Sequence, residues 1–184
     1  MNAGIIASRY ARAFLKYVSE TGSGRTVYSQ VCTLVRMMNH VPQFKMYLMD
    51  SSDVSFDRKC SLLSAALDGT VDDSIVRFLR MVTDHNREEY FPRMLLSFIE
   101  QYRSENNIKV GSIVAAVEND SLRVRLENLF HDLTGAEVHL EEKVSPEIIG
   151  GFIFELDGNR LDASVDSQLK RIRRQLVEKN NRIV

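Results

Sequence analysis

Apolar residues recur at helical spacing along the first 106 residues of the chain, and strand-like alternation replaces this pattern from residue 108 onward. A helix buries one face through residues three and four apart, whereas a strand points every second residue to the same side. The change of period therefore predicts two parts, an α-helical part at 1–106 and a small α/β part at 107–184. Asn106 and Asn107 mark the expected boundary.

The first part is predicted to hold six short helices joined by brief turns. Gly22 and Gly24 stop the first helix, Pro42 suits the first turn of the third, and Ser55 and Gly69 bound the fourth. The six expected ranges are 4–20, 25–39, a short helix from 42, 55–69, 71–86 and 90–105. Helices of this length with short connections predict a compact antiparallel bundle.

The second part alternates strands and helices. Strands are expected from Ile108, in AEVHLEEKV and in GFIFEL, and helices at about 120–133 and 164–180. In AEVHLEEKV, Val138 and Leu140 alternate with polar neighbours, which is typical of a half-buried strand. The leucines expected on one face of the first of these helices are Leu122, Leu126, Leu129 and Leu133. The pattern predicts a small α/β domain.

Two adjacent glycines, Gly150 and Gly151, precede the apolar run of the third strand. A phosphate-binding loop needs backbone amides at the start of a helix, usually with a lysine in the pattern GxxxxGK[ST]. Here the strand-forming residues 152–154 follow, and no lysine stands in register. The glycines therefore predict a bulge or a close backbone contact where a strand begins, and not a nucleotide site.

The sequence contains no recognisable catalytic or metal-binding motif. It has no GxSxG and no HExxH, and its four histidines are scattered. Cys32 and Cys60 fall on apolar helical patterns, so we expect small buried thiols in a reducing compartment. No apolar run is long enough to span a bilayer, and the N-terminus does not resemble a secretory signal. We expect no active site, cofactor or metal ion.

Apolar residues cover an unusually wide arc on two helices of the first part. The arc spans roughly 200° on the first helix and roughly 220° on the fifth, where one core face needs about 100°. The arcs consist of Ile6, Ala7, Tyr10, Ala11, Ala13, Phe14, Leu15, Tyr17 and Val18, and of Val71, Ile75, Val76, Phe78, Leu79, Met81 and Val82. Neighbouring helices of the same bundle can cover both sides of such a helix. Alternatively, part of each arc lines a groove for a helix of another protein.

Charge is segregated in the second part. Residues 137–157 carry a net charge of −5 and residues 164–184 a net charge of +4. The basic last helix, with a narrow apolar stripe through Val165, Leu169, Ile172 and Leu176, either balances its own sheet or docks a charged partner helix. An RNA-binding module is the alternative function, although the net charge of −1 for the whole chain and the lack of aromatic residues among the basic ones argue against it.

Three stretches carry a resemblance to a known family. They are SRYARAFLKY, HNREEYFPRMLLSFIEQYRSEN and VSPEIIGGFIFELDGNRLDASVDSQLKRIRRQL, in order along nearly the whole chain. The chain resembles the delta subunit of bacterial F-type ATP synthase, a relative of the mitochondrial oligomycin sensitivity conferral protein. The resemblance implies a non-catalytic subunit of the peripheral stalk, or stator, which holds the catalytic head still and so couples proton transport to ATP synthesis.

The resemblance also implies partners and residues that bind them. Domain 1–106 would bind the N-terminal segments of the alpha subunits, and domain 107–184 the b subunits, at the cytoplasmic face of the bacterial inner membrane. The groove of the family lies on the first and fifth helices, which assigns alpha-subunit binding to Tyr10, Ala11, Phe14, Ile75, Phe78 and Leu79. In the second domain, structural roles go to Gly150 and Gly151 at the start of a strand, and to Asp162 and Ser164 as caps of the last helix.

Overall fold

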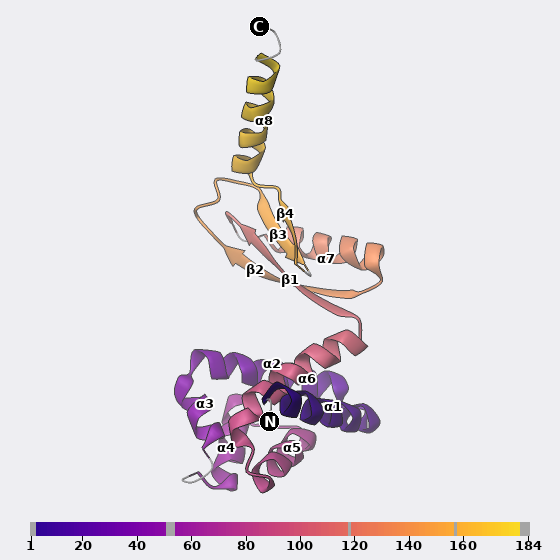
Figure 1. The fold of residues 1–184 in the computed structure, drawn as a ribbon, viewed down its shortest axis with the longest axis vertical. Coiled ribbons are helices and arrows are strands. Elements are labelled where there is room, and N and C mark those ends of the chain that lie inside the picture. Colours follow the sequence, from indigo (N-terminus) through magenta and orange to yellow (C-terminus); the bar gives the residue numbers. More distant parts are fainter. Residues whose placement is uncertain (1–2, 51–53, 118, 157, 181–184) are drawn as a thin grey trace. The chain divides into compact units, whose positions relative to one another are not determined.

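The structure, a computed structural model, describes residues 3–50, 54–117, 119–156 and 158–180, with the side chains of 176–180 outside the description. The chain divides into two compact units, Met1–Asn106 and Asn107–Val184. The first unit is helical, and the second holds a small four-stranded sheet with helices, as Figure 1 shows. The predicted fold class, a helical part followed by a small α/β part, is confirmed at this level.

Helices make up most of the described first unit. They are α1 (Ala3–Thr21), α2 (Gly24–His40), α3 (Pro42–Met49), α4 (Phe56–Ala66), α5 (Asp73–Asp84), the 3-10 turn η1 (Glu88–Tyr90) and α6 (Phe91–Glu105). Each range predicted from periodicity is helical over most of its length. Gly22 follows α1 with a left-handed backbone, φ 72°, which glycine adopts at low cost and which commonly ends a helix.

The first helix, α1, is central in this unit. It packs against α2, α5, α6 and η1. The ring of Phe14 in α1 stacks on Phe78 of α5 with centroids 4.2 Å apart, and it meets Phe98 of α6 at 4.8 Å. Aromatic pairs contribute about 0.5–1.5 kcal/mol beyond the area they bury. This aromatic cluster therefore joins three helices through the middle of the unit.

A buried ion pair connects α4 to η1. Lys59 Nζ lies 3.3 Å from Glu88 Oε1, and the two residues are 1% and 2% exposed. Within the described residues, the second carboxylate oxygen of Glu88 has no hydrogen-bond partner. Taking charges out of water costs several kcal/mol per ion, and only good geometry lets their attraction offset that cost. The pair is therefore a specific connection between two elements more than a source of stability.

Strands and helices alternate in the second unit. In chain order they are β1 (Ile108–Ala115), α7 (Asp120–Thr134), β2 (Glu137–Val144), β3 (Phe152–Leu156), β4 (Asn159–Asp162) and α8 (Val165–Asn180). The sheet order is β2-β1-β3-β4, in which β1 and β2 are parallel and the other neighbours antiparallel. The sequence pattern does not predict β4, because all four of its residues are exposed and only its pairing with β3 defines it.

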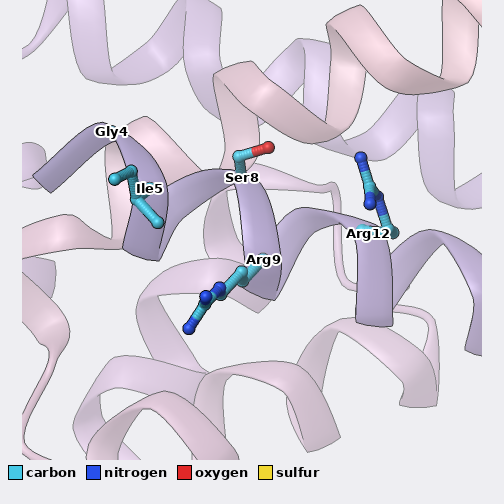
Figure 2. Close-up of a pocket in the computed structure, with 5 residues that line it drawn as sticks. All are labelled: Gly4, Ile5, Ser8, Arg9 and Arg12. Carbon is cyan, nitrogen blue, oxygen red and sulfur yellow. The ribbon is translucent and has the colours of Figure 1, made fainter. Parts of the chain in front are cut away.

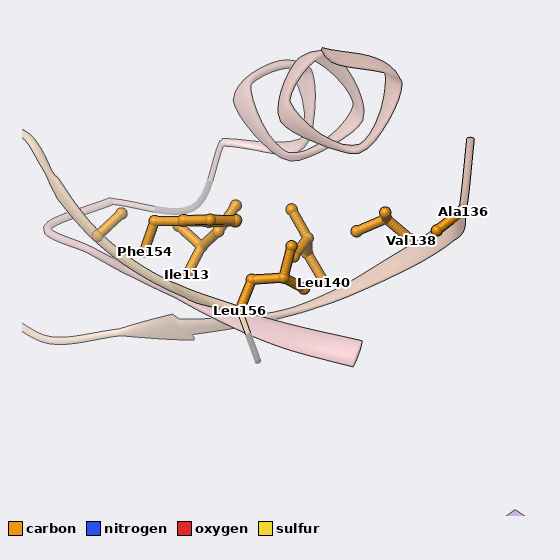
Figure 3. Close-up of a cluster of buried hydrophobic side chains, with 7 residues drawn as sticks. Ile113, Ala136, Val138, Leu140, Phe154 and Leu156 are labelled. Carbon is orange, nitrogen blue, oxygen red and sulfur yellow. The ribbon is translucent and has the colours of Figure 1, made fainter. Parts of the chain in front are cut away.

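The core of the second unit lies between α7 and one face of the sheet. Figure 3 shows the buried side chains on the face of the strands that is turned toward α7. Leu126 and Phe130 of α7 pack against this cluster, and the Phe130 ring stacks on Phe154 at 4.5 Å. The predicted leucine face is wrong in its last turns, since Leu129 and Leu133 are 50% and 71% exposed. The aromatic ring of Phe130 takes the place over the sheet that the leucine pattern assigned to them.

Candidate protein-binding surfaces

Five of the six residues predicted to bind a partner on the first and fifth helices lie in the core. Their exposed fractions are 0% for Ala11, 3% for Phe14, 0% for Ile75, 3% for Phe78 and 0% for Leu79. A partner cannot reach these side chains in this arrangement, so their assignment to an open groove is corrected to the core. Neighbouring helices cover most of both wide arcs, which is the first of the two alternatives. Tyr10, the sixth residue, is half-buried.

Side chains beside these core residues form a surface along the line where α1 meets α5, here named the α1–α5 seam. The seam consists of Tyr10, Ala13 and Tyr17 from α1, Arg77 and Met81 from α5, and His85 and Arg87 after α5. Spacings of three and four residues place each set on one face of its helix. Ala13, Arg77 and His85 are exposed, and the two tyrosines and Met81 are half-buried. The seam is thus the accessible margin of the wide apolar arcs.

Tyrosine–arginine contacts hold the seam together. Arg77 Nη1 donates a hydrogen bond to Tyr17 Oη at 3.2 Å, and Arg87 Nη1 donates one to Tyr10 Oη at 2.8 Å. The Arg87 guanidinium also lies 5.2 Å from the centre of the Tyr10 ring, which His85 meets edge-on at 6.5 Å. The seam therefore presents aromatic and aliphatic surface bordered by positive charge, which suits an amphipathic helix with acidic residues at its edges.

Sequence reasoning missed the polar members of this surface. Arg77, His85 and Arg87 do not belong to the apolar arcs, and their contacts with tyrosines of another helix depend on tertiary structure. One signal was available in the sequence. Apolar residues at 10, 13 and 17 mark one margin of the first arc. Met81 marks the matching margin of the fifth helix and lies four residues from each of the polar residues Arg77 and His85.

A shallow hollow lies on another face of α1. Gly4, Ile5, Ser8, Arg9 and Arg12 line it. Figure 2 shows the Arg9 and Arg12 side chains extending from α1 in different directions, so their guanidinium groups do not converge on a common point. A ligand site needs a few polar groups aimed at the same atoms of a ligand. This hollow lacks such an arrangement.

The last helix, α8, carries apolar side chains on its outside. Val165, Leu169 and Ile172, here named the α8 stripe, are 38%, 57% and 51% exposed. Leu176, predicted for the same stripe, lies outside the described side chains. Exposed basic residues accompany the stripe: Lys170, Arg171, Arg173 and Arg174. Figure 1 shows α8 extending away from the sheet, which leaves the stripe open to a partner.

The two glycines before β3 lie against the start of α8. The Val165 amide donates to the Gly150 carbonyl and the Ala163 amide donates to the Phe152 carbonyl, both at 2.9 Å. Gly151 has a φ of 79°, and a Cβ atom there would press on the carbonyl oxygen of Ala163. Another residue would therefore be strained both by its backbone and by lack of space. The glycines allow the backbone before β3 to approach α8 closely.

Asp162 and Ser164 organise the first turn of α8. Asp162 Oδ1 accepts hydrogen bonds from the amide and the hydroxyl of Ser164, at 3.0 and 2.6 Å, and its Oδ2 accepts one from the Ser167 hydroxyl at 2.7 Å. Ser164 Oγ in turn accepts the amide of Ser167 at 3.3 Å, as the N-cap of a helix does. Ser164 thus contacts the helical amide, and Asp162 fixes Ser164.

Acid is expected to loosen this first turn. Hydrogen bonds from the hydroxyls of Ser164 and Ser167 lower the pKa of Asp162 to about 2, whereas an aspartate in an unfolded chain has a pKa of about 3.9. Because the folded value is the lower one, the stabilisation is complete above about pH 4 and is lost as the pH falls from there toward 2. Amide NMR signals of residues 164 and 167 should follow this titration, and Asp162→Asn should abolish it. A wild-type midpoint at the unfolded value would contradict the hydrogen-bonded cap.

Known proteins are similar to this chain along its whole length. A family model described as ATP synthase delta (OSCP) subunit matches residues 6–176. The chain belongs to this family. Relatives named ATP synthase subunit delta come from Bacteroides fragilis, 35% identical, and Phocaeicola vulgatus, 36% identical, each over 187 residues that cover 100% of both chains. A chain of the Toxoplasma gondii mitochondrial ATP synthase hexamer shares the fold, with a TM-score of 0.61 at 19% identity over 93% of this chain and 97% of that one.

Membership of the ATP synthase delta (OSCP) family decides the broad function. The chain is a non-catalytic subunit of the peripheral stalk, a peripheral part of a membrane complex, as the resemblance implies. The comparisons give no support to the alternative of an RNA-binding module. Among the described residues, no helix is long and apolar enough to cross a membrane, and no three His, Cys, Asp or Glu side chains are grouped so as to hold a metal ion.

Proposed function

We propose that this delta subunit connects two partners of the ATP synthase through its two units. The helical unit, 1–106, binds the N-terminal helical segment of an alpha subunit along the α1–α5 seam. The α/β unit, 107–184, binds the b subunits through α8, at the cytoplasmic face of the bacterial inner membrane. Held at both ends, the subunit keeps the catalytic head from turning with the rotor, so that proton transport stays coupled to ATP synthesis.

The observation that carries the first half of the proposal is the composition of the α1–α5 seam. Its half-buried side chains, Tyr10, Tyr17 and Met81, can lose further exposed surface to a partner without any movement of the core. Full burial of a large apolar side chain is worth about 1.5–3 kcal/mol, so three half-buried ones supply a few kcal/mol. Arg77 and Arg87 at the border favour a partner helix with acidic residues flanking its apolar face.

The second half of the proposal is supported by the exposed stripe of α8. Three apolar side chains at spacings of four and three form a continuous row, and four basic residues lie on the described faces beside it. A row with this spacing is the usual contact of one helix with another. Acidic residues on the partner helix would pair with the basic residues, so binding should weaken as salt is added.

Two labelled peptides and two charge substitutions test both halves at once. The peptides are the N-terminal segment of the alpha subunit and the C-terminal segment of the b subunit from the same organism, titrated with the full-length protein by fluorescence anisotropy. Met81→Glu should lower the affinity for the alpha peptide by about tenfold or more, because binding of that peptide would bury the new charge in the seam. The affinity for the b peptide should not change. Leu169→Glu should do the reverse.

Each variant serves as the control of the other. Both positions are partly exposed, so the substitutions should leave the helical circular dichroism unchanged. The proposal is wrong if neither peptide binds the wild-type protein at tens of micromolar, or if each substitution weakens both peptides equally. Binding of the b peptide to residues 107–184 through another surface would show as insensitivity to Leu169→Glu.

A further inference from the structure

We infer that the buried Lys59–Glu88 ion pair positions Arg87, and through it Tyr10, in the α1–α5 seam. The inference rests on the proposed binding of an alpha-subunit segment to the seam. Lys59 and Glu88 are 1% and 2% exposed, so neither can touch a partner itself. They would act as positioning residues, which set the arrangement of residues that do touch it.

In the connection between α5 and α6, two adjacent residues contact two different helices. Arg87 reaches α1, where its guanidinium donates to Tyr10 Oη at 2.8 Å. Glu88, the next residue, reaches α4, where its carboxylate accepts from Lys59 Nζ at 3.3 Å. Because one peptide bond joins them, η1 cannot shift on α4 without moving the start of the Arg87 side chain.

The backbone of this connection leaves little freedom to absorb such a shift. Asn86 has a left-handed backbone, φ 52°, and its amide donates to the Thr83 carbonyl at 2.9 Å. The Arg87 amide donates to the Val82 carbonyl at 3.0 Å. The turn is therefore closed onto the last residues of α5. The position of η1 against α4 can still change, and the ion pair fixes that position.

An ion pair sets such a position more narrowly than apolar side chains do. Apolar groups pack nearly as well in several arrangements, whereas a buried carboxylate and ammonium are compensated only when they meet. The pair is not optimised for stability, since Glu88 Oε2 has no partner among the described residues. Buried ion pairs of this kind can be replaced by apolar residues without loss of stability, and specifying one arrangement is among their attested effects.

A shift of Arg87 would disturb its contacts within the α1–α5 seam. Arg87 contacts the Tyr10 ring as well as its hydroxyl, and His85 meets the same ring from the edge. Met81 connects to His85 through a bond between the His85 ring and the Met81 carbonyl, 2.7 Å long. A displaced Arg87 would therefore change the shape of the seam over one full turn of α5.

The test replaces the ion pair as a unit. In the full-length protein, Lys59→Met with Glu88→Leu removes both charges and leaves none unpaired, and Lys59→Leu with Glu88→Met serves if the first variant does not fold. The alpha-subunit peptide is titrated against each. We expect the midpoint of unfolding to be retained and peptide affinity to fall by about tenfold, while the b-subunit peptide binds as before.

A thermodynamic cycle separates positioning from a general effect. Arg87→Ala alone should weaken the alpha peptide, and adding the double replacement to it should cause no further loss, because the pair acts through Arg87. Additive losses, or wild-type affinity in the double variant, would overturn the inference. If the wild-type protein itself binds no peptide, the proposed function fails. The NMR signals of the Tyr10 and His85 rings then decide the inference, and unchanged signals in the double variant refute it.

Discussion

Phe78→Ala should lower the free energy of unfolding of the helical unit by about 3–5 kcal/mol. The Phe78 ring is 3% exposed, stacks on Phe14 and lies 5.9 Å from the Phe91 ring, so its removal leaves a cavity between α1, α5 and α6. Urea unfolding followed by circular dichroism measures the loss. Phe78→Asp should abolish folding of the unit, because it places a charge in this cavity without a partner.

The matched control lies one turn further along α5. Met81→Ala removes a half-buried side chain at the seam and should cost well under half as much stability as Phe78→Ala. The two substitutions should also differ in binding, since Met81 faces a partner and Phe78 does not. A Phe78→Ala protein with unchanged stability and lost peptide binding would return Phe78 to an open groove.

Lys59→Met should be as damaging as the loss of a core aromatic residue. It leaves the Glu88 carboxylate 2% exposed with no cation beside it, and breaking a buried pair in this way costs about 3–5 kcal/mol. Urea unfolding of the full-length protein measures the loss in the helical unit. A substitution on an exposed ion pair, Lys16→Met beside Glu20, is the control and should change stability by less than about 1 kcal/mol.

Adding Glu88→Leu to Lys59→Met should restore the stability that the single substitution removes. The double variant has no buried charge, and apolar replacements of buried ion pairs are neutral or stabilising in comparable cases. Loss of stability that grows from the single to the double variant would mean that the pair contributes net stability. That outcome would also weaken the case for a positioning device.

Periodicity predicted the secondary structure well where one face of an element is buried and the other exposed. Val138 and Leu140 are 6% exposed and lie on the face of β2 that α7 covers, as their alternation predicts. The strand β4 escaped prediction because none of its side chains is buried, and hydrogen bonds to β3 define it. A short polar strand leaves no hydrophobic pattern in a sequence.

The wide apolar arcs allowed two interpretations, and the structure supports the first, in which helices of the same unit cover most of both arcs. Arc width shows how many sides of a helix are buried, but it does not show whether the same chain or another covers them. Here α2, α5, α6 and η1 surround α1, and Phe14 and Phe78 fill the space between α1 and α5 with their own rings. The accessible seam combines the margins of the arcs with Arg77 and Arg87, whose contacts arise only in the folded unit.

The position of β1 in the sheet has a mechanical consequence. This strand begins at Ile108, with two residues between it and the end of α6 at Glu105, and it lies between β2 and β3. A pull on the chain at that point acts along β1 and loads the hydrogen bonds to both neighbours simultaneously. A pull from α8 meets first the four-residue edge strand β4, which pairs with β3 alone. Under tension, the α/β unit should therefore yield at its last strand while β1, the strand that follows α6 in the chain, still holds.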